Sequence, residues 1–286
     1  MIRVIIFTFA LTTILSKDCT AKEIVPNEDS TQWDSTAETS TEEYPLNLDI
    51  SDGENNTETI QRSRRSDPGL LVPIQQFPYI VSLYDYDGDY MCAGTILKAR
   101  LILTANHCIA PFKPFSIRAG SRDLQSGGQK IKVKDVIRYP GADKDGKVQP
   151  HDIGLVVLSE SITNARTVTL VGPNDPIYEG SAVFSVGWGK KSFGDPRLLW
   201  ASPVQISKIK NCEKHYKGNW ICIDTIKTAT CVGDSGGPII YEGKQIGIVS
   251  HSADMTKCGS GIPAANVKVK QYLTWINQYV KKREYD

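Results

Sequence analysis

The stretch Cys231–Ile240, CVGDSGGPII, places Ser235 between an aspartate and two glycines. Glycine adopts positive φ at little cost and serine caps its own backbone, so this composition predicts a tight turn. The serine is either a turn residue or a nucleophile. Its hydroxyl is protonated at neutral pH, so a nucleophilic serine needs a histidine base and a group that orients the histidine. The rest of the chain must decide between these two interpretations.

Candidates for the base and the acid occur upstream of Ser235. The chain has four histidines, and His107 lies in LTANHCI, beside Cys108 at the end of a predicted strand. Asp152 begins the apolar run DIGLVVL. A carboxylate at the start of a buried strand is costly unless hydrogen bonds satisfy it. His107 and Asp152 are therefore the candidate partners of Ser235.

At these three places the sequence resembles the chymotrypsin-like (trypsin-like fold, S1 family) serine endopeptidases, whose marks are T-A-x-H-C, D-I-x-L and G-D-S-G-G-P. The motifs occur here in the family's order, as TANHC, DIGL and GDSGGP, and the resemblance runs from about Phe77 to the C-terminus. It implies that Ser235 attacks the scissile carbonyl, His107 transfers the proton and Asp152 orients His107. It also implies an oxyanion hole formed by the backbone N–H groups of Gly233 and Ser235.

The G-x-S-x-G pattern of the α/β hydrolases also fits GDSGG. In those enzymes the acid and the histidine follow the serine. Only His251 follows Ser235, with no aspartate between them. The flanking segments are strands without alternating helices, so we set this alternative aside.

The region after Phe77 has an all-β pattern of short, β-branched segments separated by Gly, Pro, Asp or Asn. These segments span residues 79–88, 95–105, 131–139, 153–158, 181–189, 243–251 and 264–269. The tail differs, because residues 272–280 have helical spacing and end at a basic cluster. We expect two packed antiparallel β-barrels with a C-terminal α-helix.

The N-terminal part divides into two segments. Residues 1–21 have the charged start, apolar run and small-residue end of a secretory signal peptide, which predicts a secreted, extracellular protein. Residues 22–65 hold eleven acidic against four basic residues, lack periodicity and end in RSRR. We expect a disordered pro-segment that a furin-like protease cuts between Arg65 and Ser66, before a peptidase domain over 66–286. Asn55 begins a glycosylation sequon.

The chain has seven cysteines, and removal of the signal peptide would remove Cys19. An even set then remains, which suits disulfides in an oxidising compartment, although sequence alone allows fifteen pairings. The resemblance implies three bridges: Cys92–Cys108, Cys212–Cys222 and Cys231–Cys258. Neither CxxC nor a histidine pair at ligand spacing occurs, so we expect no metal, and no cofactor is implied.

The resemblance places the substrate-binding pocket at Ala229, Ser252 and Ala264. No acid occurs at these positions, so a buried lysine or arginine of the substrate would lack a counter-charge. We expect cleavage after small or medium apolar residues. An alternative remains in which loop shape, rather than these three residues, sets the pocket.

Two departures from the family pattern leave a second function open. A cut after Arg65 exposes SDPG rather than an Ile-Val-Gly-Gly-like end, and Ser66 forfeits roughly 1.5 to 3 kcal/mol of apolar burial. His251 stands where the family usually has tryptophan. The alternative to a protease is therefore a non-catalytic homologue that acts as a binding or cofactor module.

The expected partners follow from the class of protein. We expect protein or peptide substrates, a furin-like processing protease and protein inhibitors, with the chain itself a monomer. The basic residues are scattered and no nucleic-acid motif occurs, so we expect no nucleic acid partner. After the first 21 residues no stretch is long and apolar enough for a membrane helix, so we expect no membrane partner.

Overall fold

A computed structural model of the chain describes residues 69–145, 151–189, 195–216, 218, 220–224, 233–251 and 262–286. The predicted signal peptide, the acidic segment with Asn55, and the processing site at Arg65 and Ser66 lie outside the described residues.

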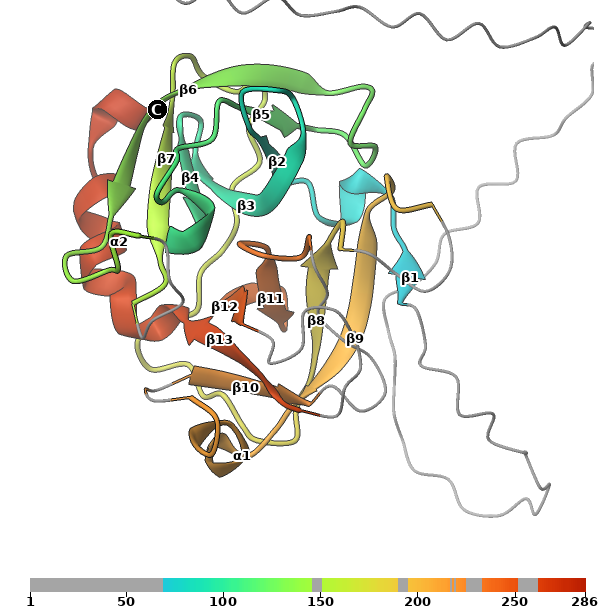
Figure 1. Cartoon of the computed structure of the whole chain (residues 1–286), viewed down its shortest axis with the longest axis vertical. Helices are drawn as coiled ribbons and strands as arrows, with labels where there is room; N and C mark the ends of the chain where they lie inside the picture. Colours follow the sequence, from blue (N-terminus) through green and yellow to red (C-terminus); the bar gives the residue numbers. More distant parts are fainter. Residues whose placement is uncertain are drawn as a thin grey trace, which may run out of the picture. The chain divides into compact units, whose positions relative to one another are not determined.

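The first barrel has six strands: β2 (Ile80–Tyr84), β3 (Tyr90–Lys98), β4 (Leu101–Thr104), β5 (Ser116–Ala119), β6 (Gln129–Arg138) and β7 (Gly154–Leu158). They close antiparallel in the order β2-β3-β4-β7-β6-β5, and β5 pairs back onto β2 (Figure 1). In β6 the buried Ile131 and Val133 alternate with exposed lysines, because successive side chains of a strand point to opposite faces. Every residue of β7 is buried, as its GLVVL sequence requires.

The second barrel has six strands: β8 (Ala182–Gly187), β9 (Trp200–Ile206), β10 (Trp220–Asp224), β11 (Pro238–Tyr241), β12 (Lys244–His251) and β13 (Ala264–Lys268). Their order is β9-β10-β13-β12-β11-β8, and pairing of β8 with β9 closes the barrel. The short β1 (Leu70–Leu71) pairs with the start of β9, at Trp200 and Ala201, whereas β10 pairs with the end of β9.

The described helices are short. The α-helices are α1 (Ile209–Glu213) and α2 (Leu273–Val280), and the 3₁₀ turns are η1 (Ile74–Gln76), η2 (Asn106–Cys108), η3 (Val269–Tyr272) and η4 (Arg283–Tyr285). In α2 the buried Trp275 packs its ring against Tyr139 of the first barrel, with ring centroids 5.4 Å apart. The predicted two-barrel fold with a C-terminal helix is confirmed, although Tyr272 belongs to the preceding 3₁₀ turn.

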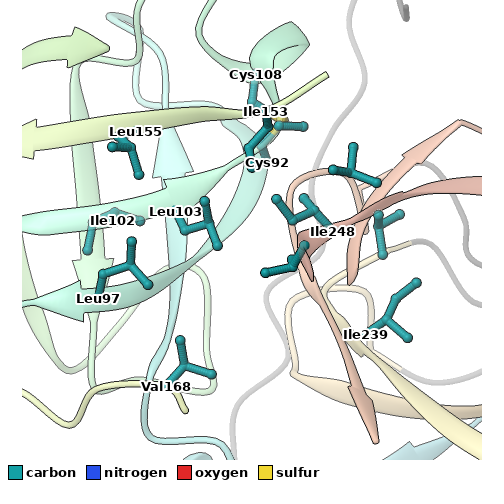
Figure 2. Packing of buried hydrophobic residues seen from close by; sticks show 14 of the residues in the cluster. Cys92, Leu97, Ile102, Leu103, Cys108, Ile153, Leu155, Val168, Ile239 and Ile248 are labelled. Carbon is teal, nitrogen blue, oxygen red and sulfur yellow. A yellow bond between two sulfur atoms is a disulfide. The ribbon is translucent and has the colours of Figure 1, made fainter. Parts of the chain in front are cut away.

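Each barrel has an apolar interior. Figure 2 shows Leu97, Ile102, Leu103 and Leu155 in the first barrel, and Ile239 and Ile248 in the second. These side chains are almost fully buried, which makes their packing the main stabilising contribution to the fold. Within the described residues, no helix is both long and apolar enough to cross a bilayer.

Candidate active site

His107 lies in the turn η2 directly after β4. A disulfide joins its neighbour Cys108 to Cys92 of β3, and the Asn106 side chain donates a hydrogen bond to the carbonyl of Asp143 (2.9 Å). These contacts fix the turn on the barrel wall. About one-fifth of the His107 side chain stays exposed, so the imidazole is held in place and still reaches solvent.

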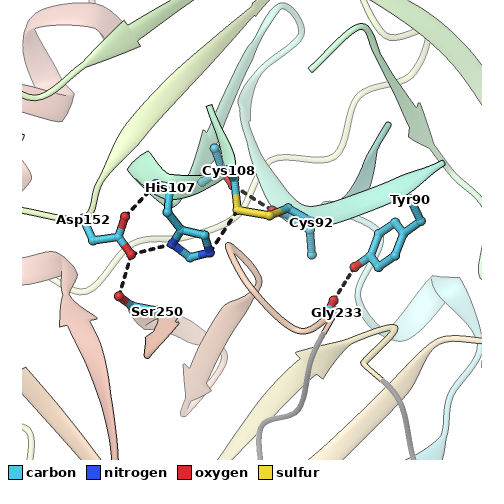
Figure 3. The surroundings of a disulfide bond; sticks show 9 residues. Tyr90, Cys92, His107, Cys108, Asp152, Gly233 and Ser250 are labelled. Atoms are coloured by element: carbon cyan, nitrogen blue, oxygen red, sulfur yellow. Dashed lines mark hydrogen bonds and ion pairs between the residues drawn. A yellow bond between two sulfur atoms is a disulfide. The ribbon is translucent and has the colours of Figure 1, made fainter. Parts of the chain in front are cut away.

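Asp152 is 1% exposed, and both of its carboxylate oxygens accept hydrogen bonds. Oδ2 lies 2.7 Å from His107 Nδ1, and Oδ1 accepts the His107 backbone N–H at 2.8 Å (Figure 3). The Ser250 hydroxyl donates a third bond to Oδ2 at 2.6 Å. Three donors therefore satisfy the buried carboxylate, and an ionised Asp152 keeps a proton on Nδ1 and leaves Nε2 as the basic nitrogen.

Ser250 is a site residue that the sequence analysis missed. It is buried in β12, where its backbone N–H donates to Asn266 Oδ1 at 3.3 Å. A lone serine in an apolar strand carries no sequence signal of its own. Its contact with Asp152 joins the two barrels, because Ser250 belongs to the second barrel and Asp152 lies two residues before β7 of the first.

Ser235 lies in the turn before β11, and backbone contacts place this turn against the disulfide. The Ala93 N–H donates to the Ser235 carbonyl at 2.8 Å, and Ala93 follows Cys92 in β3. At Gly236 (φ +76°), an added Cβ would lie 2.2 Å from Thr104 Oγ1 and 3.2 Å from Cys108 Sγ. Only glycine permits this close approach.

The His107 imidazole and the Ser235 hydroxyl come from adjoining parts of the structure, but no hydrogen bond joins these two described groups. The Nε2 atom instead lies 3.6 Å from Cys108 Sγ. The structure thus links His107 with Asp152 and places the Ser235 backbone on the same disulfide-bonded wall. Catalytic hydrogen bonds are often long in a free enzyme and tighten only when the substrate binds.

Gly233 and Ser235 offer two backbone donors. Gly233 has φ +98°, a conformation that L side chains rarely adopt. Gly236 and Gly237 donate their N–H groups to Val249 and Asp234, whereas the N–H groups of Gly233 and Ser235 have no acceptor among the described residues. Two unused donors in one turn match the requirement of an oxyanion hole.

Of the three predicted pocket residues, only Ala264 belongs to the part of the chain that the structure describes. Ala264 is fully buried at the start of β13, opposite Ile223 of β10. Ala229 and Ser252 lie outside the described residues, as do Cys231 and Cys258. The second described disulfide joins Cys212 of α1 to Cys222 of β10. The two described bridges are pairings that the resemblance implies.

His251 ends β12, with its ring perpendicular to that of Tyr216 at 4.8 Å. Its Nδ1 is buried and has no hydrogen-bond partner among the described residues. Burial lowers the pKa of His251, an effect that Asp152 opposes and His107 reinforces. The lowered pKa makes the neutral form of His251 more favourable than that of a free histidine.

One described group, His107 with Cys92 and Cys108, has three potential metal-ligand atoms within 4.8 Å of one another. The two sulfur atoms are bonded to each other, so they offer no thiolate to a metal ion.

The barrels and the His107–Asp152 pair define a chymotrypsin-like serine protease fold. The sequence model of the family described as Trypsin matches residues 69–276, and the chain belongs to this family. It is 30% identical to Trypsin 5G1 of Aedes aegypti over 233 residues, which cover 77% of this chain and 86% of the relative. It is 29% identical to trypsin of Sus scrofa, covering 74% and 94%. Among solved structures it resembles neuropsin, a serine protease expressed in the limbic system of mouse brain (TM-score 0.65, 30% identity, 73% and 97% covered).

Proposed function

We propose that this chain is a serine endopeptidase that hydrolyses peptide bonds through an acyl-enzyme. The observation that carries the proposal is the buried Asp152 carboxylate, which holds His107 through both its ring and its backbone N–H. A carboxylate kept ionised in the interior is costly. Its hydrogen bonds to the ring and backbone of one partly exposed histidine suit a role in orienting a base.

In the proposed reaction the Ser235 Oγ attacks the scissile carbonyl carbon while His107 Nε2 takes the hydroxyl proton. The carbonyl π bond breaks and its oxygen becomes an oxyanion facing the N–H groups of Gly233 and Ser235. The carbonyl re-forms, the C–N bond breaks, and His107 returns the proton to the departing amine. Water then attacks the acyl-enzyme by the same route, releasing the acid and regenerating Ser235.

The protein in this proposal is a secreted precursor. Residues 1–21 direct export, and a furin-like protease cuts the 22–65 segment between Arg65 and Ser66, which leaves a peptidase domain over 66–286. The disulfides Cys92–Cys108 and Cys212–Cys222 support an oxidising compartment, because cytosolic thiols are kept reduced. Asn55 would be glycosylated, and the mature monomer would meet protein inhibitors.

For specificity, we propose cleavage after small or medium apolar residues. The lack of an acidic residue at Ala229, Ser252 and Ala264 supports this, because a buried lysine or arginine side chain of the substrate would lack a counter-charge. Profiling a peptide library tests it: a profile dominated by arginine before the cut would contradict the proposed pocket.

The catalytic proposal is tested with a fluorophosphonate probe on protein cleaved after Arg65, with Ser235→Ala as the control. The proposal predicts labelling of the wild type at Ser235 and none in the control. The alternative, a non-catalytic binding module, is motivated by Ser66, which would stand where the family has an apolar residue at the new N-terminus. It predicts no labelling even after complete cleavage.

A further inference from the structure

Tyr90, the first residue of β3, contacts the turn that carries the proposed oxyanion hole. Its phenol O–H donates a hydrogen bond of 2.5 Å to the Gly233 carbonyl, across 143 residues of sequence (Figure 3). Its ring also lies perpendicular to that of Trp188, with centroids 6.1 Å apart. An added Cβ at Gly233 would lie 3.4 Å from Tyr90 Cε1. The phenol therefore packs directly against the backbone of the turn.

The next residue of the turn is anchored from a second direction. Asp234 is 1% exposed, and its Oδ1 accepts the Gly189 backbone N–H at 2.8 Å. An added Cβ at Gly189 would lie 2.3 Å from the Asp234 carboxylate, so this position requires glycine. The preceding Trp188 is itself fixed by its indole N–H, which donates to the Arg122 carbonyl at 2.8 Å. The peptide between Gly233 and Asp234 is thus held at both ends.

The surroundings of Tyr90 favour its protonated phenol, although a backbone hydrogen bond from Trp188 opposes this effect. Burial and the nearby Asp234 carboxylate raise the pKa of Tyr90 well above 10. The phenol therefore keeps its proton over the physiological range and donates it to the Gly233 carbonyl.

We propose that Tyr90 is a positioning residue for the oxyanion hole, an inference that rests on the proposed protease function. Its hydrogen bond fixes the plane of the peptide after Gly233 and hence the position of the Gly233 Cα, whose own N–H is a proposed donor. Without the phenol oxygen, the turn can rotate and this N–H no longer points steadily at the oxyanion. The lost hydrogen bonding destabilises the transition state rather than the bound substrate, because negative charge develops on the substrate oxygen only in the transition state.

The test compares Tyr90→Phe with Tyr84→Phe in the protein cleaved after Arg65. Tyr84 is a matched control, because its ring lies 6.2 Å from that of Tyr90 and its hydroxyl donates to the Leu124 carbonyl, away from Gly233. Removing a whole oxyanion donor costs about 10²- to 10³-fold in kcat, so loosening one predicts roughly a 10- to 100-fold loss in Tyr90→Phe. We expect KM within about twofold of the wild type, because substrate ground-state binding does not use the oxyanion donors. Tyr84→Phe should keep kcat.

Affinity for a peptide aldehyde, which forms a tetrahedral adduct, should fall in Tyr90→Phe by the same factor as kcat. Both variants are measured at a temperature where circular dichroism shows them folded. Unchanged kcat in Tyr90→Phe, or equal losses in both variants, would overturn the role of Tyr90. A wild type that is not labelled by fluorophosphonate would instead overturn the protease proposal itself.

Discussion

The substitution Asp152→Asn tests how the buried carboxylate controls His107. All three groups that contact Asp152 now act as donors: the His107 backbone N–H, His107 Nδ1 and the Ser250 hydroxyl. An asparagine must turn its NH₂ group toward one side. If the NH₂ group takes the place of Oδ1, it faces the backbone N–H of His107, and two buried donors oppose each other. If the NH₂ group takes the place of Oδ2, it can donate hydrogen bonds to both the Ser250 hydroxyl and His107 Nδ1. This is possible because the hydroxyl can rotate and Nδ1 can lose its proton.

The second orientation keeps every hydrogen bond but moves the imidazole proton to Nε2, where the base must be free. Catalysis needs the tautomer that carries the proton on Nδ1. Restoring it leaves two buried donors, Nδ1–H and the asparagine NH₂, unpaired, at a cost of about 1 to 3 kcal/mol each. The competent state therefore lies roughly 2 to 6 kcal/mol higher, which predicts a loss in kcat/KM of about 30-fold to more than 10⁴-fold. The free energy of unfolding should change little, since no hydrogen bond is lost.

Peptide hydrolysis and urea unfolding, measured on the same preparations, test this reasoning. Ser250→Ala is the control, because it removes a donor to the carboxylate and leaves the tautomer unchanged. It should lose about 1.5 to 3 kcal/mol of stability and less activity than Asp152→Asn. If Asp152→Asn keeps kcat/KM within tenfold of the wild type, the tautomer argument is wrong.

Two further substitutions test the packing of the turn and the state of His251. Gly236→Ala should lower the free energy of unfolding by on the order of 3 kcal/mol, from backbone strain and the clash with Thr104. The control is Gly243→Ala, because Gly243 also has positive φ (+72°) but has open space where a Cβ would lie. It should lower the free energy of unfolding by only about 1 kcal/mol in the same urea titration, and equal losses in the two variants would refute the clash at Gly236. Because burial lowers the folded-state pKa of His251, the unfolded chain binds a proton more readily below about pH 6.5, so the wild type should lose stability there. His251→Phe should lose less Tm between pH 7 and pH 5, and an identical pH dependence would refute this role of His251.

The sequence predicted the architecture because the strands carry clear burial patterns. The alternation of Lys130, Ile131, Lys132 and Val133 and the apolar run of β7 both identify strands. The predicted segment 95–105 proved to contain the end of β3 and all of β4, because the turn at residues 99–100 has neither glycine nor proline to mark it. Strands β5, β9, β10 and β11 were missed. Strand β9 carries Pro203, and a proline in a sequence segment argues against a central strand there.

The site was predictable only where a local motif marks it. The motifs identified His107 and Asp152, and the structure joins them by two hydrogen bonds. Ser250 and Tyr90 had no such signal. Ser250 lies 98 residues from its partner Asp152, and Tyr90 contacts Gly233 from the other barrel, so both contacts depend on how the barrels pack. Sequence periodicity identifies the faces of strands but not the contacts between barrels.

In the proposed mechanism Ser235, His107 and Asp152 act together at one reactive centre. A crystal structure of the Arg65-cleaved protein with a peptide boronic acid tests this most directly. We predict a covalent bond from Ser235 Oγ to boron, His107 Nε2 within hydrogen-bond distance of the adduct, and a boronate oxygen facing the N–H groups of Gly233 and Ser235. A Ser235 hydroxyl that stays unmodified and remote from His107 at saturating inhibitor would contradict it.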